Sequence, residues 1–372
     1  MSSPTVLAIC GDPGGASALA PVLHALMEQR RTELRVLAYN QALDVLAARG
    51  IVAEAIPPEA AASWPADSLR ALRPAAIVAA TSCNGRDYER HFIVAARAAG
   101  IPSLALLDFW SNYRQRFTGT AGELIVPDAI AVMDEAARVA MVECGFPPAV
   151  LRITGQPAFD SLAARREAFG AQRRSHIRRA TGTADDDLQV LFVSQPLRAL
   201  YGTDATAAGH PGYDETEVLL EVQGALAAAT TRLSRPLTLV VRPHPRERLD
   251  SSVETLASPF RTVVSAAGDQ YEAAMAADLV IGMSSVLVIE AWQLGCAVLS
   301  LQPGATQPVF GTQARDGLAV ETDRTQLRSA VQSALARVLA AGTARGRDRF
   351  PAAATPKVVQ CVYSLISDSS RS

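Results

Sequence analysis

Four short segments carry side chains whose types and spacing suit chemistry on a phosphate-bearing ligand. In the first, Asp12 lies within Cys10-Gly-Asp-Pro-Gly-Gly-Ala16, directly after an apolar run. Gly14 and Gly15 would let the backbone turn tightly and approach a ligand, and a helix that begins there offers free N–H groups. The segment matches neither Gly-x-Gly-x-x-Gly nor a lysine-bearing phosphate loop, which argues against NAD and ATP. A plain strand-to-helix turn is the alternative.

The second segment is Val241-Arg-Pro-His-Pro-Arg-Glu247, at the end of an apolar run in the second half of the chain. We expect His244 to donate a hydrogen bond to a phosphate oxygen and Arg242 or Arg246 to supply positive charge. The two prolines restrict the backbone, so the imidazole would be held with little entropy left to lose. The alternative is a rigid solvated loop with a surface histidine.

The third segment runs from Ala277 to Gly295 and has the pattern of a strand, a glycine, a serine pair and an amphipathic helix. Ser284 is the predicted N-cap, and its hydroxyl, that of Ser285 and the bare N–H groups of the first turn would form an anion pocket. Glu290 could accept hydrogen bonds from ribose hydroxyls, or it could be a surface charge. A serine that merely caps its own helix is the alternative for Ser284.

The fourth segment is Leu106-Leu-Asp-Phe-Trp-Ser-Asn-Tyr-Arg-Gln-Arg116. Apolar neighbours would raise the pKa of the Asp108 carboxyl, which suits a general base, and Asp12 is the competing base. The alternative is that Asp108 caps the next helix while the aromatic residues belong to the core. The expected contacts of a second substrate are the neighbouring side chains Trp110, Tyr113 and Arg114.

Two further segments, Thr154-Gly-Gln-Pro157 and Ser194-Gln-Pro-Leu-Arg198, each follow an apolar run. Because the ends of parallel strands face the ligand crevice of an open sheet, we expect these segments to position a base or a phosphate. The residues expected to do so are Gly155, Gln156, Ser194 and Gln195.

The elements that must position these residues follow one pattern along the chain. Short runs rich in Val, Ile and Leu, such as Val6–Cys10 and Ala76–Ala80, alternate with Ala-rich stretches of helical length. Near-continuous apolar runs are typical of parallel strands covered on both faces. The pattern predicts an α/β protein with two Rossmann-like doubly wound domains that face each other across a cleft.

The series of strands breaks once, over a basic stretch at 165–179 and a polar stretch after it. This predicts a Rossmann-like N-terminal domain over 1–165, a linker over 166–186 and a Rossmann-like C-terminal domain over 187–352, for which the resemblance described below implies an acceptor domain and a nucleotide-binding domain, respectively. Residues 353–372 are predicted to form a helix that packs back on the first domain. The basic stretch is expected to be a solvated helix face, and contact with a membrane surface is the less favoured interpretation.

Composition excludes several classes of protein. The 372 residues carry 35 Lys and Arg against 37 Asp and Glu, whereas a dedicated nucleic-acid binder needs a basic excess. The five cysteines are dispersed without a Cys-x-x-Cys pair, which indicates reduced thiols rather than a disulfide framework or a zinc site. The sequence has neither the pattern of a signal peptide nor an apolar run long enough to span a bilayer, so we expect a cytoplasmic protein.

The order of these segments resembles the GT-B glycosyltransferase superfamily and the related non-hydrolysing UDP-N-acetylglucosamine 2-epimerases. The turn at Gly11–Gly15 looks like the first loop of these proteins, and Pro127–Leu162 looks like the epimerase segment that leads into the second domain. The stretch Asp278–Leu299 is similar to their nucleotide-binding strand and helix, with Glu290 where a ribose-binding glutamate is expected.

The chain departs from the epimerases at two places. They carry an acidic residue where this chain has Ala80-Thr-Ser-Cys83, and a catalytic histidine where it has Ser194-Gln-Pro196. His244-Pro245 followed by Ser284-Ser285 looks more like CDP-glycerol glycerophosphotransferases and the bacterial CMP-sialic acid or Kdo transferases. In those families a His-Pro pair and a later serine pair hold the nucleotide phosphates, and Asp108 would match the acidic base.

The resemblance therefore implies a metal-independent transferase that moves a sugar or polyol phosphate from a nucleotide-activated donor to a hydroxyl of a small-molecule or glycan acceptor, as in bacterial surface polysaccharide synthesis. No cofactor is implied. The implied catalytic groups are Asp108, Asp12 and His244. The implied nucleotide contacts are Arg242, His244, Ser284, Ser285, Glu290, Gly155, Gln156, Ser194 and Gln195. The implied acceptor contacts are Gly14, Gly15, Trp110, Tyr113 and Arg114.

Two alternatives stay open at this stage. One is a UDP-sugar 2-epimerase or hydrolase, and the other is a non-catalytic protein that binds sugar nucleotides. We expect no nucleic-acid partner and at most peripheral contact with a membrane, and a homodimer is left open.

Overall fold

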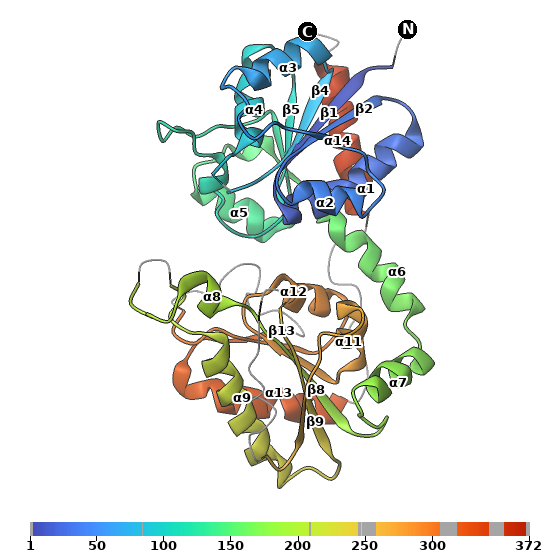
Figure 1. Cartoon of the computed structure of the whole chain (residues 1–372), viewed down its shortest axis with the longest axis vertical. Helices are drawn as coiled ribbons and strands as arrows, with labels where there is room; N and C mark the ends of the chain where they lie inside the picture. Colours follow the sequence, from blue (N-terminus) through green and yellow to red (C-terminus); the bar gives the residue numbers. More distant parts are fainter. Residues whose placement is uncertain are drawn as a thin grey trace. The chain divides into compact units, whose positions relative to one another are not determined.

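The computed structural model describes residues 3–83, 85–207, 210–244, 247, 258–305, 318–341 and 353–369. The chain divides into two compact units, Met1–Asp160 together with Phe350–Ser372, and Ser161–Arg349. Each unit contains one parallel sheet packed against helices, as Figure 1 shows. The residues 166–186, treated above as a linker, fall within the second unit.

The strands described in the first unit are β1 (Thr5–Cys10), β2 (Glu33–Ala38), β3 (Glu54–Ala55), β4 (Ala76–Ala80), β5 (Ser103–Leu106), β6 (Ala129–Val132) and β7 (Leu151–Ile153). They form a sheet in the order β3-β2-β1-β4-β5-β6-β7 with parallel pairing throughout. In its centre, Ala8 of β1 pairs with Val36 on one side and Val78 on the other. A central strand covered on both faces buries every side chain, which explains its continuous apolar sequence.

The helices of the first unit are α1 (Pro13–Gln29), α2 (Ala42–Ala47), α3 (Trp64–Leu72), α4 (Tyr88–Ala98), α5 (Glu135–Glu143) and α14 (Ala354–Ser369), with short 3-10 turns η1 (Gln115–Phe117), η2 (Pro148–Val150) and η3 (Pro157–Phe159). The C-terminal helix α14 packs against α1, and its Val358 and Val362 belong to the same core as Val6. The carboxylate of Asp160 accepts the backbone N–H groups of Ala354 and Thr355 at 2.9 and 2.7 Å. Asp160 therefore fastens the first turn of α14 to the end of the preceding part of the unit.

The second unit begins with α6 (Asp160–Ala168) and α7 (Ala171–Ala180), and its later helices are α8 (Leu197–Tyr201), α9 (Glu215–Thr230), α11 (Gln270–Ala276), α12 (Val286–Gln293) and α13 (Leu327–Ala341), with the 3-10 turn η4 (Arg324–Gln326). Its described strands are β8 (Leu188–Val193), β9 (Leu237–Arg242), β10 (Arg261–Val264), β11 (Leu279–Gly282), β12 (Val298–Leu301) and β13 (Leu318–Glu321). They form a parallel sheet in the order β10-β9-β8-β11-β12-β13.

Strand order determines where each sheet can hold a ligand. In the first sheet the order reverses between β1 and β4, and in the second it reverses between β8 and β11. At such a reversal the helices that follow the two strands leave toward opposite faces, so the loops part and open a crevice at the carboxyl ends of the strands. Each unit therefore has a switch point, at the loops after β1 and β4 and at the loops after β8 and β11.

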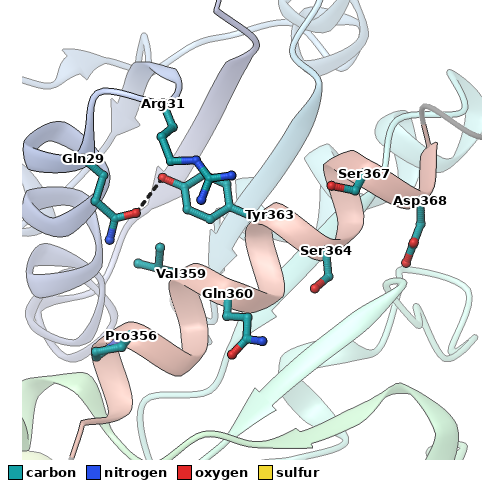
Figure 2. A pocket seen from close by; sticks show the side chains of 9 residues that line it. All are labelled: Gln29, Arg31, Pro356, Val359, Gln360, Tyr363, Ser364, Ser367 and Asp368. Atoms are coloured by element: carbon teal, nitrogen blue, oxygen red, sulfur yellow. Dashed lines mark hydrogen bonds between the residues drawn. The ribbon is translucent and has the colours of Figure 1, made fainter.

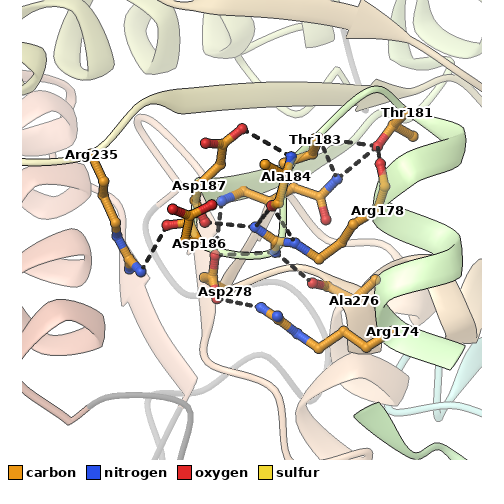
Figure 3. A network of polar contacts seen from close by, with 11 residues as sticks. Arg174, Arg178, Thr181, Thr183, Ala184, Asp186, Asp187, Arg235, Ala276 and Asp278 are labelled. Atoms are coloured by element: carbon orange, nitrogen blue, oxygen red, sulfur yellow. Dashed lines mark hydrogen bonds and ion pairs between the residues drawn. The ribbon is translucent and has the colours of Figure 1, made fainter. Parts of the chain in front are cut away.

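The basic stretch at 165–179 is held by acidic residues of the second unit. Arg174 and Arg178 converge on the carboxylate of Asp278, at 2.7 and 3.3 Å, as Figure 3 shows. Arg178 has 0% exposure and also donates to the carbonyls of Ala184, Asp187 and Ala276. The expectation of a solvated helix face is thus wrong for Arg178, because its guanidinium is buried and its donors are used by backbone carbonyls and the Asp278 carboxylate.

Among the described residues, none of the helices combines the length and the apolar composition needed to cross a bilayer.

Candidate functional site

Asp12 follows β1 and is the N-cap residue of α1, with extended backbone angles φ −97° and ψ 151°. An aspartate at this position usually accepts a hydrogen bond from its own helix. The Asp12 side chain makes no such cap. Its Oδ2 accepts instead from the backbone N–H of Cys83, in the loop after β4, at 3.3 Å. The carboxylate is thus directed across the switch point, where ligands of this fold class bind.

The glycines beside Asp12 are explained by close packing within the unit. A Cβ atom at Gly11 would lie 2.1 Å from the Tyr39 ring, and one at Gly14 would lie 2.3 Å from Oδ2 of Asp108. A Cβ atom at Gly15 would lie 2.8 Å from that of Ala80 in β4. These glycines let the protein's own side chains approach the first turn of α1, and their contact with an acceptor stays a prediction.

Asp108 lies after β5 and is paired with a buried arginine. Nη1 of Arg116 donates to Oδ1 of Asp108 at 2.5 Å and to Oγ1 of Thr81 at 2.8 Å. The Asp108 side chain is 10% exposed. Burial raises the pKa of Asp108 above its usual range, and the charge of Arg116 opposes part of that rise. Gln156 donates to the backbone carbonyl of Asp108, so this predicted nucleotide contact lies in the first unit and supports the Asp108 segment.

Glu89, in the first turn of α4, is a carboxyl group that the sequence analysis missed. It is 2% exposed, and its Oε2 accepts from the hydroxyls of Tyr39 at 2.5 Å and Ser82 at 2.8 Å. Burial raises the pKa of Glu89 to about 7, against the two hydrogen bonds, and the nearby charge of Asp12 adds to the rise. Three carboxyl groups, those of Asp12, Glu89 and Asp108, therefore gather at the switch point of the first unit.

The predicted acceptor contacts Trp110, Tyr113 and Arg114 differ in how far their side chains are buried. Trp110 is 4% exposed, its indole N–H donates to Asp134 at 2.9 Å, and its ring stacks on Phe159. These contacts favour the alternative that Trp110 belongs to the core, and its contact with an acceptor stays a prediction. Arg114 donates to the carbonyl of Cys144 at 3.1 Å, beyond the end of α5. Tyr113 is half-buried and stays a predicted acceptor contact. Gly155, whose φ of 92° suits glycine, stays a predicted nucleotide contact.

In the second unit the loops at the switch point are bonded to one another. Oε1 of Gln195, after β8, accepts from the backbone N–H of Ser284, after β11, at 2.8 Å. Ser194 donates its hydroxyl to Oε1 of Glu247 at 2.6 Å, and Oε2 of Glu247 accepts from the backbone N–H of His244 at 2.9 Å. The structure therefore brings Ser194, Gln195, His244 and Ser284 to one edge of one sheet and adds Glu247, which the sequence analysis missed.

Ser285 rather than Ser284 is the N-cap of α12. Its hydroxyl accepts from the backbone N–H of Leu287 at 3.2 Å, and its extended φ and ψ are those of a cap. The predicted cap was wrong by one residue, because the strand ends at Gly282 and two residues intervene before the cap. Ser284 lies just outside the helix and is part-exposed.

Glu290 projects from the middle of α12 and is 9% exposed. Its Oε1 accepts from the hydroxyl of Tyr271 at 2.9 Å, and the guanidinium of Arg165 lies 4.9 Å from the centre of the Tyr271 ring. Burial raises the pKa of Glu290 to about 7, while Tyr271 and Arg165 oppose the rise. Burial, with the nearby carboxylate, also raises the pKa of Tyr271 to about 12, so its hydroxyl keeps its proton and remains a donor. The surface-charge alternative for Glu290 is therefore wrong.

Arg242, at the end of β9, donates to the carbonyls of Ala267 and Gly268 at 3.0 and 2.8 Å. Its charge could still face a ligand, but part of its donor capacity is used by the backbone. The neighbouring Pro245 and Arg246 lie outside the described residues. A nucleotide contact of Arg242 and of the His244 imidazole stays a prediction.

A pocket of about 450 Å³ lies on α14, away from the switch point of the first unit. Figure 2 shows Tyr363 projecting toward the end of α1, where its hydroxyl donates to Gln29 at 3.0 Å and Arg31 lies over its ring. Gln29 ends α1 and Arg31 precedes β2, so this pocket is at the amino end of the strands. It is therefore separate from the candidate site, which is at their carboxyl ends.

No protein-family model matches the chain, and no curated protein matches it in sequence. Solved structures do match it. The UDP-GlcNAc 2-epimerase from Neisseria meningitidis, bound to UDP-GlcNAc, is 15% identical over 97% of this chain and 100% of its own, with a TM-score of 0.65. The UDP-GlcNAc 2-epimerase from Methanocaldococcus jannaschii is 11% identical over 97% of this chain and 99% of its own, with a TM-score of 0.66. MurG from Acinetobacter baumannii is 14% identical over 97% of this chain and 99% of its own, with a TM-score of 0.57.

At these identities the likeness establishes the fold. The chain has the GT-B fold, with two Rossmann-like units, as the sequence predicted. The cleft expected between the two units stays a prediction.

Proposed function

We propose that the chain is an enzyme that acts on a nucleotide-activated sugar and breaks the bond between the anomeric carbon and the nucleoside diphosphate. We favour 2-epimerisation or hydrolysis of a UDP-sugar over transfer of the sugar to an acceptor. This order of preference reverses the one drawn from the sequence motifs. It is supported by the names of the similar structures, two of which are UDP-GlcNAc 2-epimerases.

The observation that carries the proposal is the group of carboxyls at the switch point of the first unit. The charge of Asp12 contributes to raising the pKa of both Glu89 and Asp108. A carboxyl group whose pKa burial raises, such as that of Asp108, suits a reaction that removes a proton and later returns one. The segment Ala80-Thr-Ser-Cys83 at the end of β4 has no acidic residue, but Asp12 accepts from the backbone N–H of Cys83 and Glu89 accepts from the hydroxyl of Ser82. Carboxyl groups from other elements thus lie beside this segment.

In the proposed reaction, Asp12 or Asp108 removes the proton from C2 of the sugar. The electrons of the C2–H bond form a C1–C2 double bond while the C1–O bond breaks, and the nucleoside diphosphate leaves with the bonding pair. Return of the diphosphate to C1 and of a proton to the other face of C2 gives the epimer. Addition of water in place of the diphosphate gives the free sugar. Neither route needs a metal ion or a cofactor.

The nucleotide end of the substrate would be held by the second unit. Ser284 and Ser285 offer hydroxyl groups beside the first turn of α12, and hydrogen-bond donors near a leaving phosphate stabilise its developing charge. Glu290 has one carboxylate oxygen bonded to Tyr271, and its other oxygen would accept from ribose hydroxyls. His244 and Arg242, at the end of β9, are the proposed phosphate contacts.

Transfer to an acceptor hydroxyl is the second candidate, because His244 and the serine pair lie at one sheet edge as in the transferases that the sequence resembles. Asp108, held by Arg116, would then act as the base toward that hydroxyl. The acceptor, and a homodimer, belong to this proposal as predictions.

Incubation with UDP-GlcNAc in D₂O and without acceptor tests the proposed function. We expect release of UDP, or formation of the C2 epimer, with deuterium incorporated at C2. Turnover that starts when an acceptor is added, without deuterium at C2, would favour the transferase. The proposal is wrong if UDP, CMP, CDP and GDP sugars are all unchanged and none of these nucleotides raises the melting temperature, since a bound ligand stabilises by RT ln(1 + [L]/Kd).

A further inference from the structure

Glu89 has no role in the reaction as written above, yet it is the most enclosed of the three carboxyl groups. Its Oε2 accepts two hydroxyl donors, and its Oε1 is buried without a hydrogen-bond partner among the described residues. A buried carboxyl that lacks partners is costly, so its presence needs an explanation. The contacts of its two donors provide one.

The first donor, Tyr39, leads back to Asp12 through Gly11. The Tyr39 ring lies so close to Gly11 that a Cβ atom there would be 2.1 Å from it. The backbone N–H of Tyr39 also donates to the carbonyl of Cys10 at 3.1 Å. The ring thus packs against the backbone that leads into Asp12. The hydrogen bond from its hydroxyl to Glu89 fixes the position of the ring, because both ends of the side chain are then held.

The second donor, Ser82, leads to Asp12 through Cys83. Ser82 donates to Glu89 at 2.8 Å, and the next residue, Cys83, donates its backbone N–H to Oδ2 of Asp12 at 3.3 Å. The Tyr39 and Ser82 hydroxyls lie 3.1 Å apart, so the two routes meet at one oxygen of Glu89. Glu89 therefore contacts Asp12 indirectly by two routes. Tyr39 packs against the backbone before Asp12, and Ser82 precedes Cys83, whose N–H bonds to the Asp12 carboxylate.

We propose that Glu89 is a positioning residue that holds Asp12 in the geometry required for proton transfer. The part of this proposal that concerns catalysis rests on the proposed function, whereas the part that concerns the Asp12–Cys83 contact does not. A carboxyl oxygen suits this task because it accepts two hydroxyl donors at once. The groups that surround the network are Cys10, the last residue of β1, Asp12, which follows it, and Arg86, which lies over the Tyr39 ring.

The catalytic test compares three variants with a control. Glu89→Gln keeps the volume but replaces one acceptor by a donor, and Tyr39→Phe and Ser82→Ala each remove one donor. We expect kcat to fall about 10- to 100-fold in Glu89→Gln, since a misplaced catalytic group costs on this order. The KM for UDP-GlcNAc should change less than about twofold, because nucleotide contacts are proposed for the second unit. Glu28→Gln, on the exposed face of α1, is the matched control and should keep the wild-type kcat.

A second measurement is independent of activity. The chain has five cysteines, so protein labelled with ¹⁵N-cysteine gives five backbone amide signals, of which Cys83→Ser identifies one. We expect the Cys83 amide signal to move in Glu89→Gln and in Ser82→Ala, and to stay in Glu28→Gln. An unchanged Cys83 signal in a folded Glu89→Gln protein overturns the proposal, even if activity falls. A raised KM with unchanged kcat overturns it too, and wild-type protein that does not turn over a sugar nucleotide refutes the proposed function while leaving the amide test valid.

Discussion

Each unit contains an arginine, a tyrosine and a buried glutamate arranged alike. The tyrosine hydroxyl donates to the glutamate, and the arginine lies over the tyrosine ring, at 5.1 Å from its centre in the first unit and 4.9 Å in the second. The pKa of each glutamate is raised to about 7 by burial. We call these sets the first triad, Arg86, Tyr39 and Glu89, and the second triad, Arg165, Tyr271 and Glu290.

The two triads differ in what else meets the carboxyl. Glu89 accepts a second hydroxyl from Ser82, and the negative charge of Asp12 adds to the rise in its pKa. The negative charge of Asp269 likewise adds to the rise in the pKa of Glu290, but the positive charge of Arg165 opposes it. Similar pKa values therefore arise from different balances, and the pKa does not reveal the role. The neighbouring residues indicate the role instead. Those of Glu89 contact the backbone beside Asp12 and the segment that bonds to its carboxylate, whereas Glu290 projects from α12, which follows the serine pair.

The largest effect that sharpens this comparison is expected from Asp12→Asn, which removes the group that the first triad is proposed to serve. We expect kcat to fall by about 10² to 10⁴, the usual contribution of a general acid or base. The melting temperature and KM should stay near wild type, as they should in the exposed control Asp44→Asn on α2. Retained kcat in Asp12→Asn would move the acid–base role to Asp108.

The next effect separates the triads by ligand binding. Glu290→Gln should raise the Kd of UDP about 10- to 100-fold, because hydrogen bonds to a charged group contribute about 1.5–3 kcal/mol. Glu89→Gln should leave this Kd unchanged. Isothermal titration calorimetry measures both, with Glu221→Gln, which pairs with Arg328, as the control. If Glu89→Gln and Glu290→Gln raise the Kd of UDP by the same factor, the proposed difference between the triads is wrong.

A smaller effect is expected from pH on nucleotide binding. Ribose hydroxyls donate to the ionised carboxylate, and the pKa of about 7 means that Glu290 must lose a proton when nucleotide binds at lower pH. Affinity for UDP should therefore be about tenfold lower at pH 6 than at pH 8, since one pKa unit corresponds to 1.36 kcal/mol. In Glu290→Gln this part of the pH dependence should vanish, while Glu89→Gln should retain it.

The smallest effect concerns stability. The pKa of Glu89 is about 7 in the folded protein against a model value of 4.5, so between these values the folded state binds a proton that the unfolded state releases. Stability should thus fall as pH rises from about 4.5 to 7, by up to about 3 kcal/mol for this group. Thermal unfolding at pH 5 and pH 8 should show a smaller difference in Glu89→Gln than in wild type. The same difference in both proteins would mean that Glu89 is ionised at pH 5.

Much of the fold and part of the site could be predicted from the sequence, because both depend on local patterns. Continuous apolar runs predicted the parallel strands, and residues just after them predicted Asp12, Gln195 and Ser285 at the switch points. Tyr39 follows β2 in the same way and could have been found by the same rule. The position of the helix cap was missed by one residue, since two adjacent serines have the same capping chemistry.

Residues that act through tertiary contacts could not be found in this way. Glu89 lies inside a helix, 50 residues from Tyr39, and nothing in its local sequence distinguishes it from a solvated helix charge. The same holds for Tyr271 in α11, which donates a hydrogen bond to Glu290 in α12. Arg178 was misjudged for the converse reason, since a polar group buried by packing resembles an exposed one in sequence.

The fastening of α14 by Asp160 has a consequence for synthesis on the ribosome. The first 160 residues emerge long before Val358, Val359 and Val362, which complete their core. Until α14 has been synthesised, the first unit lacks one of its packing helices, whereas the second unit already has its own sheet and core. The second unit should therefore fold first, and deletion of residues 354–369 should destabilise the first unit rather than the second.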